Sequence, residues 1–246
     1  MSSTSIQPKG DVKINGDATV GGGEYENIVI NGAGILSGPV QAKSLRVNGS
    51  GRAEADVQAA TVFVAGAAEL RGNVRVSEEF TANGAASIRG DLDGGKVTAR
   101  GAIDVAGSVR ATDIVLSGAL SVRGDVEAET LMGDGAFEID GMLNAGRIEL
   151  RLYGTCRARE IGCERIGVKR GRRGGWFRMF PENRLTADAI EGDDIVLEHT
   201  TAQVVRGHDV RLGTGCDVGL DEYSGTLVKA DDATVGKAAK IQGAAS

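Results

Sequence analysis

A glycine returns at a nearly constant interval along the first part of this chain, and that interval limits the fold more than any other feature. The steps are 17 residues long, with a single step of 18, and the glycines are Gly32, Gly49, Gly66, Gly84, Gly101, Gly118 and Gly135. A short, fixed period indicates structural units that cannot bury an apolar face alone and must stack on their neighbours. The sequence therefore predicts a solenoid.

Within each repeat, apolar residues alternate with polar ones. The repeat that begins at Ile114, for example, places Leu116, Val122 and Val126 at even spacings, which is the period of a β-strand. No stretch sustains the 3.6-residue period of a helix. Short strands that repeat every 17 residues predict an all-β, parallel β-helix with one coil per repeat and equivalent positions about 4.8 Å apart. The extra residue of the 18-residue step is expected to bulge near Ser77–Glu79.

The glycines are expected to mark corners of the coil, where a positive φ or tight packing excludes a Cβ. A second glycine column, at Gly38, Gly72, Gly90, Gly107, Gly124 and Gly141, is expected to mark another corner. Two other solenoids fit less well. A left-handed β-helix has one aliphatic residue in every six, whereas the apolar intervals here are 2, 6, 4, 2 and 3. Calcium-binding rolls need Gly-Gly-x-Gly-x-Asp repeats, of which only fragments such as Gly94-Gly95 occur.

The repeat pattern divides the chain into four parts. A polar tail over 1–11 precedes a β-helical array over 12–168, and the alternation then stops. Residues 169–184 form a basic, aromatic insert with the sequence Lys-Arg-Gly-Arg-Arg-Gly-Gly-Trp-Phe-Arg-Met-Phe-Pro-Glu-Asn-Arg. Alternation resumes over 185–243, which predicts a second β-helical block. The pattern leaves open whether this block continues the axis of the first.

The charge of the chain is unevenly distributed. Residues 151–184 hold ten Lys/Arg and three Glu, a net charge of +7, so the remainder of this −6 chain carries −13. A mainly acidic body disfavours nucleic acid as the principal partner. The stretch Met1–Lys9 lacks the apolar core of a signal peptide, and no apolar run approaches the roughly 18 residues of a membrane span. These observations predict a cytoplasmic protein.

The chemistry-bearing residues do not form a catalytic pattern. His199 and His208 are nine residues apart, and no His/Cys/Asp cluster has the spacing of a metal site. The three cysteines, Cys156, Cys163 and Cys216, are interpreted as small, reduced and buried side chains. The carboxylates at Asp91, Asp93, Asp125 and Glu127 recur at outward positions and indicate a solvated face. We therefore expect no enzyme activity, cofactor or metal. The enzymatic alternative is a carbohydrate-active β-helix, although such enzymes are usually exported and carry long side loops.

The ends of a solenoid are candidate sites of self-association. Terminal coils expose unpaired backbone N–H and C=O groups and an open apolar core, which invites another strand to add unless the end is capped. The candidate polymer contacts are Val12, Ile14 and Val20 at one end and Leu227, Val235 and Ile241 at the other. The alternative is a monomer whose tails cover both ends and which recruits a partner through its faces.

The insert is a candidate docking segment. Basic residues close to an anionic leaflet contribute about 1 kcal/mol each, and aromatic residues favour the membrane interface. The candidate docking residues, for a membrane or a partner, are Lys169, Arg170, Arg172, Arg173, Trp176, Phe177, Arg178, Met179 and Phe180. The alternative is that Trp176, Phe177 and Phe180 pack at the junction of the two blocks while the arginines remain solvated.

The repeat, together with the C-terminal block, resembles the bactofilin family of polymer-forming bacterial cytoskeletal proteins. The resemblance is closest in three stretches, which read Ile190-Glu-Gly-Asp-Asp-Ile-Val-Leu-Glu, then Thr200-Thr-Ala-Gln-Val-Val-Arg-Gly-His-Asp-Val-Arg-Leu-Gly-Thr-Gly-Cys-Asp-Val-Gly, then Glu222-Tyr-Ser. The array is a generic match, and the tail is similar to the long, two-block bactofilins of Gram-positive, spore-forming bacteria.

This resemblance implies a right-handed, roughly triangular β-helix that polymerises end to end without nucleotide. It also implies a scaffold at the inner face of the membrane that positions cell-shape, cell-wall or motility machinery, with flagellar assembly as the process for the long forms. The implied partners are further copies of the chain, a paralogous bactofilin and an anionic membrane surface. Many bactofilins carry an apolar membrane-targeting peptide at the N-terminus, and the polar stretch Met1–Lys9 departs from that pattern.

Overall fold

The computed structural model of this chain describes residues 10–171 and 183–241. These residues form 22 β-strands, β1 to β22, and contain no helix. Their contacts divide the chain into two compact units, Met1–Thr112 and Asp113–Ser246. The boundary falls inside β13 (Val109–Leu116), and the two units are described separately.

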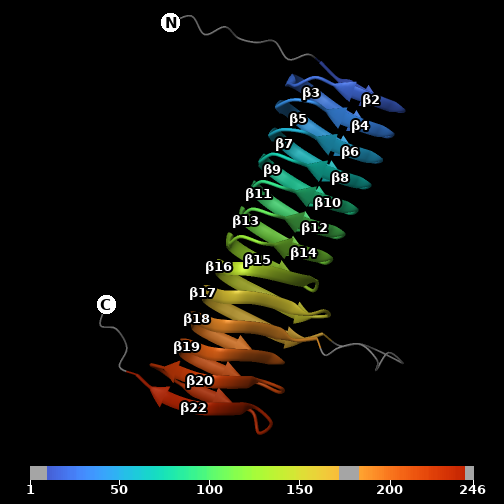
Figure 1. Cartoon of the computed structure of the whole chain (residues 1–246). Coiled ribbons are helices and arrows are strands. Elements are labelled where there is room, and N and C mark those ends of the chain that lie inside the picture. The colour runs from blue at the N-terminus through green and yellow to red at the C-terminus, as the bar shows by residue number, and fades with distance from the viewer. Residues whose placement is uncertain (1–9, 172–182, 242–246) are drawn as a thin grey trace, which may run out of the picture. The chain divides into compact units, whose positions relative to one another are not determined.

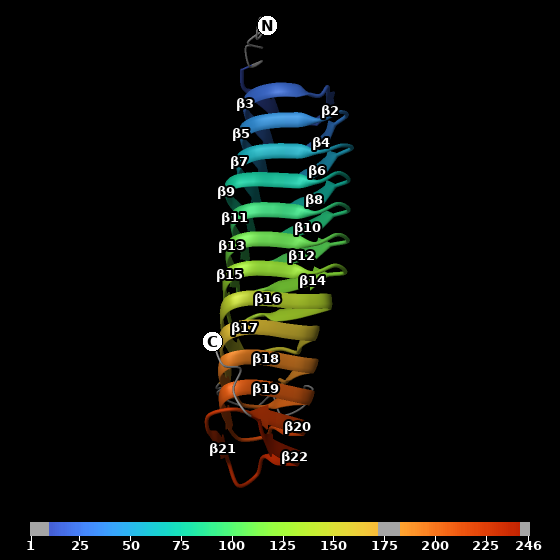
Figure 2. The same ribbon diagram turned by 90° about the vertical axis from the view of Figure 1, so that its left-hand side faces the viewer.

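The first unit is a stack of parallel coils in which long and short strands alternate. The long strands are β3 (Gly23–Ile30), β5 (Val40–Val47), β7 (Val57–Val64), β9 (Val74–Ala82) and β11 (Leu92–Ala99). The short strands are β1 (Val12–Ile14), β2 (Asp17–Val20), β4 (Ala33–Leu36), β6 (Ser50–Ala53), β8 (Ala67–Leu70), β10 (Ala85–Ile88) and β12 (Ala102–Val105). Long strands pair with the next long strand, as β5 does with β7, so they lie one above another (Figures 1 and 2).

The second unit is built from the same kind of coil. Its strands are β14 (Ala119–Val122), β15 (Val126–Gly133), β16 (Ala136–Leu152), β17 (Cys156–Arg170), β18 (Leu185–Leu197), β19 (Thr200–Leu212), β20 (Asp217–Tyr223), β21 (Leu227–Lys229) and β22 (Thr234–Lys240). Strands β16 to β19 are longer than those of the first unit. Strands β17 and β18 flank the insert and pair directly in parallel, with Ile161 opposite Ile190 and Ile166 opposite Ile195. The second block therefore stacks on the last coil that precedes the insert, which the sequence pattern left open.

The core consists of columns in which equivalent residues of successive coils lie above one another. In the first unit one buried column runs through Ile28, Leu45, Val62, Phe80 and Val97. In the second unit the corresponding column contains Leu131, Ile148, Ile166, Ile195 and Val210. Since these are the apolar positions of the repeat, the structure confirms the predicted parallel β-helix.

Tight packing explains the first glycine column. Gly66 has no positive φ, but a Cβ on it would overlap the backbone carbonyl oxygens of Gly49 and Asn48 in the coil before. Gly49, Gly84 and Gly101 meet the preceding coil in the same way. Of the two reasons offered by the sequence, close approach of successive backbones is therefore the one that applies at these corners.

The second corner is held by a ladder of side-chain hydrogen bonds. Asp56 Oδ1 accepts a hydrogen bond from the backbone N–H of Asn73 at 2.8 Å. In the next coil, Asn73 Oδ1 accepts one from the backbone N–H of Asp91 at 3.0 Å. In the coil after that, Asp91 Oδ1 accepts one from the backbone N–H of Ser108 at 2.8 Å. In the second unit, Asp125 Oδ1 accepts from the Met142 N–H at 2.8 Å. These carboxylate and amide oxygens connect one coil to the next and satisfy backbone donors that the corner would otherwise leave unpaired.

The extra residue of the 18-residue step produces the predicted bulge. Strand β7 pairs with β9 through Ala59 and Val76, and the next pair is Thr61 with Glu79. One residue, Ala60, therefore lies opposite two, Ser77 and Glu78. The bulge absorbs the insertion locally, and Val62 then pairs with Phe80 so that the core column is kept.

Replacing a corner glycine tests the packing of the backbone. We expect Gly66→Ala to lower the free energy of unfolding by about 1–3 kcal/mol, because the new methyl group overlaps carbonyl oxygens that cannot move away independently. Gly16→Ala is the matched control, since a Cβ on Gly16 meets nothing within 4 Å. Urea unfolding followed by circular dichroism measures both. Equal midpoints for the two variants would contradict this account of the glycine column.

Candidate functional site

The first strands of the first unit and the last strands of the second unit each have a neighbour on one side only. Among the described residues, β1 pairs only with β3 and β2 only with β4. In the second unit, β21 pairs only with β19 and β22 only with β20. Each of these four strands therefore presents a free edge, which is the geometry at which another strand can add.

At the N-terminal end, the predicted contact residues differ in exposure. Val12 and Val20 are partly exposed, whereas Ile14 is only 4% exposed and lies in the core column of Ile30. A polar ladder runs beside them, in which Asn31 Nδ2 donates to Asn15 Oδ1 at 2.8 Å. Ile14 thus contributes mainly to packing of the first coil, and Val12 and Val20 remain available at its edge.

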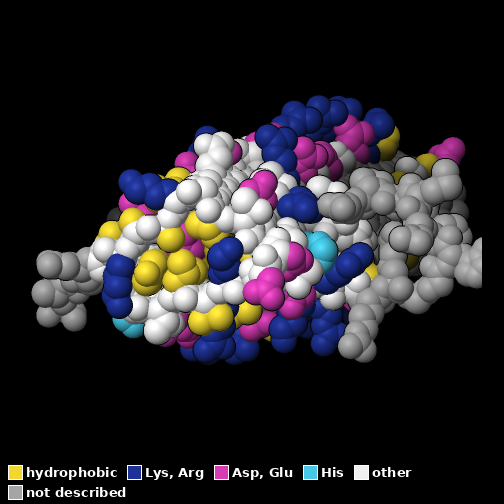
Figure 3. Space-filling view, turned by 90° about the horizontal axis from the view of Figure 1, so that it is seen from below, with side chains coloured by type: hydrophobic (Ala, Val, Ile, Leu, Met, Phe, Trp, Pro, Cys, Tyr) yellow, Lys and Arg dark blue, Asp and Glu magenta, His cyan; other side chains and the backbone are white. Residues whose placement is uncertain are grey.

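The C-terminal end exposes more apolar surface. Leu227 and Val235 are partly exposed, and Ile241 is 43% exposed while its backbone N–H donates to the Tyr223 carbonyl at 2.9 Å. Val228 on β21 is 57% exposed, and sequence reasoning missed it because its outward position in the repeat predicts a polar residue. Seen from this end, hydrophobic side chains gather in a patch with lysines and arginines at its border (Figure 3). The apolar residues Leu227, Val228, Val235 and Ile241, which lie on or directly after the two end strands β21 and β22, are together called the C-terminal apolar patch.

A buried carboxylate lies one strand away from this patch. Asp221 on β20 occupies a core column between Val205 on β19 and Ala238 on β22, and it is fully buried. Its two carboxylate oxygens have no hydrogen-bond partner. Burial raises the pKa of Asp221 to about 6. The sequence carried the signal for this residue, because an aspartate stands in a column that holds Ile190 and Val205.

Of the predicted docking residues, only Lys169 and Arg170 belong to the described part of the chain. Lys169 and Arg170, at the end of β17, are both exposed. The Arg170 backbone N–H donates to Glu198 Oε2 at 2.9 Å, which ties the end of β17 to the next coil. The other predicted docking residues, Arg172, Arg173, Trp176, Phe177, Arg178, Met179 and Phe180, lie outside the described residues.

The two histidines lie in the second unit, His199 in the turn before β19 and His208 on β19. His199 has a φ of 47° at the turn between β18 and β19. His208 Nδ1 lies 2.9 Å from Ser224 Oγ. Asp209 accepts bonds from the Thr226 hydroxyl at 2.6 Å and its N–H at 3.0 Å, which lower the pKa of Asp209. Over residues 10–171 and 183–241, no three His, Cys, Asp or Glu side chains are grouped so as to hold a metal ion.

The three cysteines are free thiols. Cys156 and Cys216 are buried, as predicted, and Cys163 is partly exposed. Burial raises the pKa of Cys156 to about 11 and that of Cys163 to about 12. A thiol with so high a pKa is almost entirely protonated at neutral pH and is a poor nucleophile. Cys156 and Cys216 therefore act as small core side chains, whereas the interpretation of Cys163 as a buried side chain is wrong.

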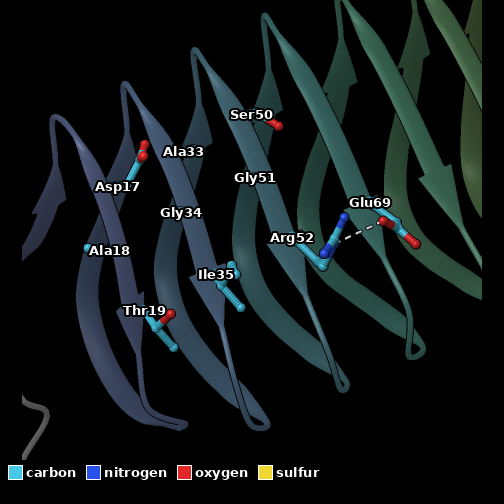
Figure 4. Close-up of a pocket in the computed structure, with 10 residues that line it drawn as sticks. All are labelled: Asp17, Ala18, Thr19, Ala33, Gly34, Ile35, Ser50, Gly51, Arg52 and Glu69. Atoms are coloured by element: carbon cyan, nitrogen blue, oxygen red, sulfur yellow. Dashed lines mark hydrogen bonds and ion pairs between the residues drawn. The ribbon is translucent and has the colours of Figure 1, made fainter.

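A shallow groove of about 570 Å³ crosses the outer face of β2, β4, β6 and β8 in the first unit (Figure 4). Small residues such as Ala33 and Ser50 form its floor, and Arg52 Nε bonds Glu69 Oε2 at 3.0 Å at one side. Arg71 also bonds Glu69, at 3.1 Å, and this bond lowers the pKa of the Glu69 carboxyl. Because the arginines favour the ionised form of this carboxyl group, Glu69 contributes a negative charge to the groove.

Comparison with known proteins identifies two relatives in Bacillus subtilis (strain 168). The chain is 45% identical over 84 residues to "Uncharacterized protein YhbF", a match that spans 34% of this chain and 34% of the relative. It is 39% identical over 104 residues to "Uncharacterized protein YhbE", which spans 41% of this chain and 44% of the relative. The chain thus matches less than half the length of either relative. No protein-family model matches the chain, and the search of solved structures found no match.

Within residues 10–171 and 183–241, the structure has no helix of the length and apolar character needed to cross a lipid bilayer.

The thiol of Cys156 offers a test of core burial. We expect iodoacetamide to alkylate Cys156 at pH 8 at least about a hundredfold more slowly in the folded chain than in urea, because a pKa raised from 9.0 to about 11 reduces the thiolate fraction by that factor. Peptide mass spectrometry after timed quenching measures each cysteine separately. Rapid labelling of Cys156 in the folded chain would show that this core column is open.

Proposed function

We propose that this chain is a non-enzymatic cytoskeletal scaffold that assembles end to end into filaments without nucleotide. The observation that carries the proposal is that β1, β2, β21 and β22 each have one edge without a described partner strand. In addition, the residues of the C-terminal apolar patch, on or directly after β21 and β22, are partly or largely exposed. The resemblance to bactofilins supports the same function. The relatives YhbE and YhbF are uncharacterised and add nothing to it beyond sequence similarity.

Strand addition supplies the physical basis for assembly. A second copy that docks at an end extends the backbone hydrogen bonds of the coil and covers apolar side chains at the same time. Both contributions recur on every coil of the stack, as in the pairing of β19 with β20 through Ala202 and Val218. A docked copy therefore adds one more inter-coil contact of a kind that the chain already makes many times.

The proposed location is the cytoplasm, at the inner face of the membrane. Lys169 and Arg170 begin a strongly basic stretch of sequence that includes the aromatic residues Trp176 and Phe177. Such a stretch suits attraction to anionic lipids. By its resemblance, the filament would position cell-wall, cell-shape or flagellar machinery, with itself or a paralogous bactofilin as partner.

A monomeric interaction module is the second candidate. The groove over β2, β4, β6 and β8 favours it, since a charged, shallow surface of about 570 Å³ can receive an extended partner. The two candidates are separated by the state of the purified chain, because an interaction module stays monomeric in light scattering. A carbohydrate-active enzyme is the least favoured, since Glu69 in this groove is bonded to two arginines.

Charged residues in the C-terminal apolar patch test assembly. We expect Val228→Glu combined with Ile241→Glu to shorten the assembled species at least severalfold, because both side chains are exposed and would have to bury a charge on docking. Met132→Glu is the control, since Met132 is 44% exposed but lies on β15, away from the end strands. Light scattering and negative-stain electron microscopy without nucleotide provide the measurement. Filaments of unchanged length in the double variant would remove the patch from the interface.

Vesicle sedimentation tests the docking segment. We expect Trp176→Glu combined with Phe177→Glu to abolish binding to anionic vesicles, and Lys169→Glu with Arg170→Glu to weaken it at least about tenfold, since each basic residue contributes about 1 kcal/mol. Arg211→Glu serves as a control of equal charge change per site on β19. If the aromatic variant sediments like the unaltered chain, the insert does not bind membranes, and junction packing becomes the better account.

A further inference from the structure

Asp221 is the most unusual side chain in the described part of the molecule. It is fully buried, and its two carboxylate oxygens are the only buried side-chain polar atoms there without a hydrogen-bond partner. The equivalent residues of the two preceding coils, Ile190 and Val205, are buried and aliphatic. An unpaired carboxylate in such a position strongly disfavours ionisation unless water can reach it.

On one side, Asp221 is covered by a single strand: β20, which contains it, pairs with β22, and no described strand pairs with the far edge of β22. In the ladder of β20 with β22, the residue opposite Asp221 is Ala238, whose side chain is a single methyl group. β22 is mostly exposed: of its seven residues only Val235 and Ala239 are partly covered, and none is buried. Detachment of β22 from β20 is thus the shortest route by which water reaches the carboxylate, and it disrupts little apolar packing.

The charged groups on the surrounding strands are engaged elsewhere. On β19, Arg206 forms ion pairs with Glu191 and, at 2.6 Å, with Glu222. On β21, Lys229 Nζ donates to the Ala233 carbonyl at 3.0 Å, and on β22 the Lys240 ammonium lies 5.9 Å from the centre of the Tyr223 ring. The remaining charged or titratable groups on the neighbouring strands are His208, Asp209, Arg211, Asp217 and Lys237. Burial is the only cause of the raised pKa of Asp221.

We propose that closure of the C-terminal end, in which β22 pairs with β20 over Asp221, takes up one proton. Between the pKa of the open form and that of the closed form, the carboxylate binds that proton when β22 closes and releases it to water when β22 detaches. At higher pH the carboxylate is ionised in both forms, and closure buries the charge instead. This inference rests on the proposed function in one respect: because β22 and the C-terminal apolar patch form the docking edge, docking of a second copy there becomes linked to the same proton.

The pH dependence of closure follows from the pKa of Asp221 in the closed and open forms. Burial raises the pKa of Asp221 from 3.8 to about 6 in the closed form, and the open form regains the ordinary value. Closure is therefore unimpeded below pH 4, weakens as the pH rises from 4 to 6, and is constant above that range. Between these limits the closing equilibrium changes by about a hundredfold, which is the difference between the two acid constants.

Hydrogen exchange of β22 is the direct test. We compare the full chain with Asp221→Asn, which stays neutral, and with Asp217→Asn, which removes an exposed carboxylate from the same strand and gives the same net charge. At pH 7.5, amides of residues 234–240 are expected to exchange about a hundredfold more slowly in Asp221→Asn than in the unaltered chain, and at pH 5 only about tenfold more slowly. Asp217→Asn is expected to match the unaltered chain at both pH values.

Two results would overturn the inference. One is equal exchange of residues 234–240 in the unaltered chain and Asp221→Asn at both pH values. The other is an equal effect of Asp217→Asn, which would make the change one of overall charge. Asp221→Val, which copies Val205 of the preceding coil, provides a second neutral variant in case the buried amide of Asn disturbs folding, and the same slowing is expected.

Assembly measured on the same proteins separates this inference from the proposed function. Asp221→Asn is expected to assemble at a lower concentration than Asp217→Asn at pH 7.5, with the gap narrowing towards pH 5. At pH 7.5 Asp221 is ionised and both variants carry the same net charge, so the difference expected there is not one of charge. Towards pH 5 Asp221 binds a proton in the closed form, and the net charges of the two variants then differ by up to one. If no protein assembles while the exchange difference holds, the filament proposal fails and proton-linked closure stands. If both assemble alike despite different exchange, the link between closure and docking is overturned.

Discussion

Everything in this molecule depends on the exact repetition of contacts between one coil and the next. Along most of the first unit, a residue pairs with the one 17 positions further along, as Leu45 does with Val62. Near the insert the step differs but the pairing is kept, as for Ile190 and Val205, so backbone hydrogen bonds and core contacts are made again on the following coil. A substitution in any column therefore alters contacts with the equivalent residues of the coils before and after it. The glycine corners show how strict this constraint is, since the Gly66 backbone passes so close to Gly49 that no Cβ fits.

The same constraint explains why the fold could be predicted from the sequence. The period identified the coil, the alternation identified the inward columns, and the 18-residue step located the bulge at Ser77 and Glu78. The corner ladder of Asp56, Asn73 and Asp91 was not foreseen as hydrogen bonding, because the pattern shows outward carboxylates without showing which backbone donors they face. The stacking of β18 on β17 was also hidden, since an insert interrupts the period without revealing the direction of the chain after it.

The candidate site was harder to predict, because it is defined by what the repeat lacks. Free edges follow from position alone, so the end strands could be named in advance. The exposure of each side chain within those strands could not be predicted. Ile14 is buried in a core column, whereas Val228, at an outward position, is largely exposed. The pattern assigns each residue an inward or outward direction, but how far an end residue is covered depends on the turns that follow, such as the one between Lys229 and Ala233.

Two core columns change character at the C-terminal end. Leu197 and Leu212 are followed in their column by Lys229, and Ile190 and Val205 are followed in theirs by Asp221. A column that receives a polar residue gains little from closing the last coil, and in the column of Asp221 the pairing of β22 also covers a carboxylate that has no hydrogen-bond partner. The end coil is thus held mainly by backbone pairing, while the coils before it are held by pairing and apolar packing together. Such an end is weaker than the body that carries it, and a weaker end strand is the part of a solenoid that solution conditions or a docked partner can most readily change.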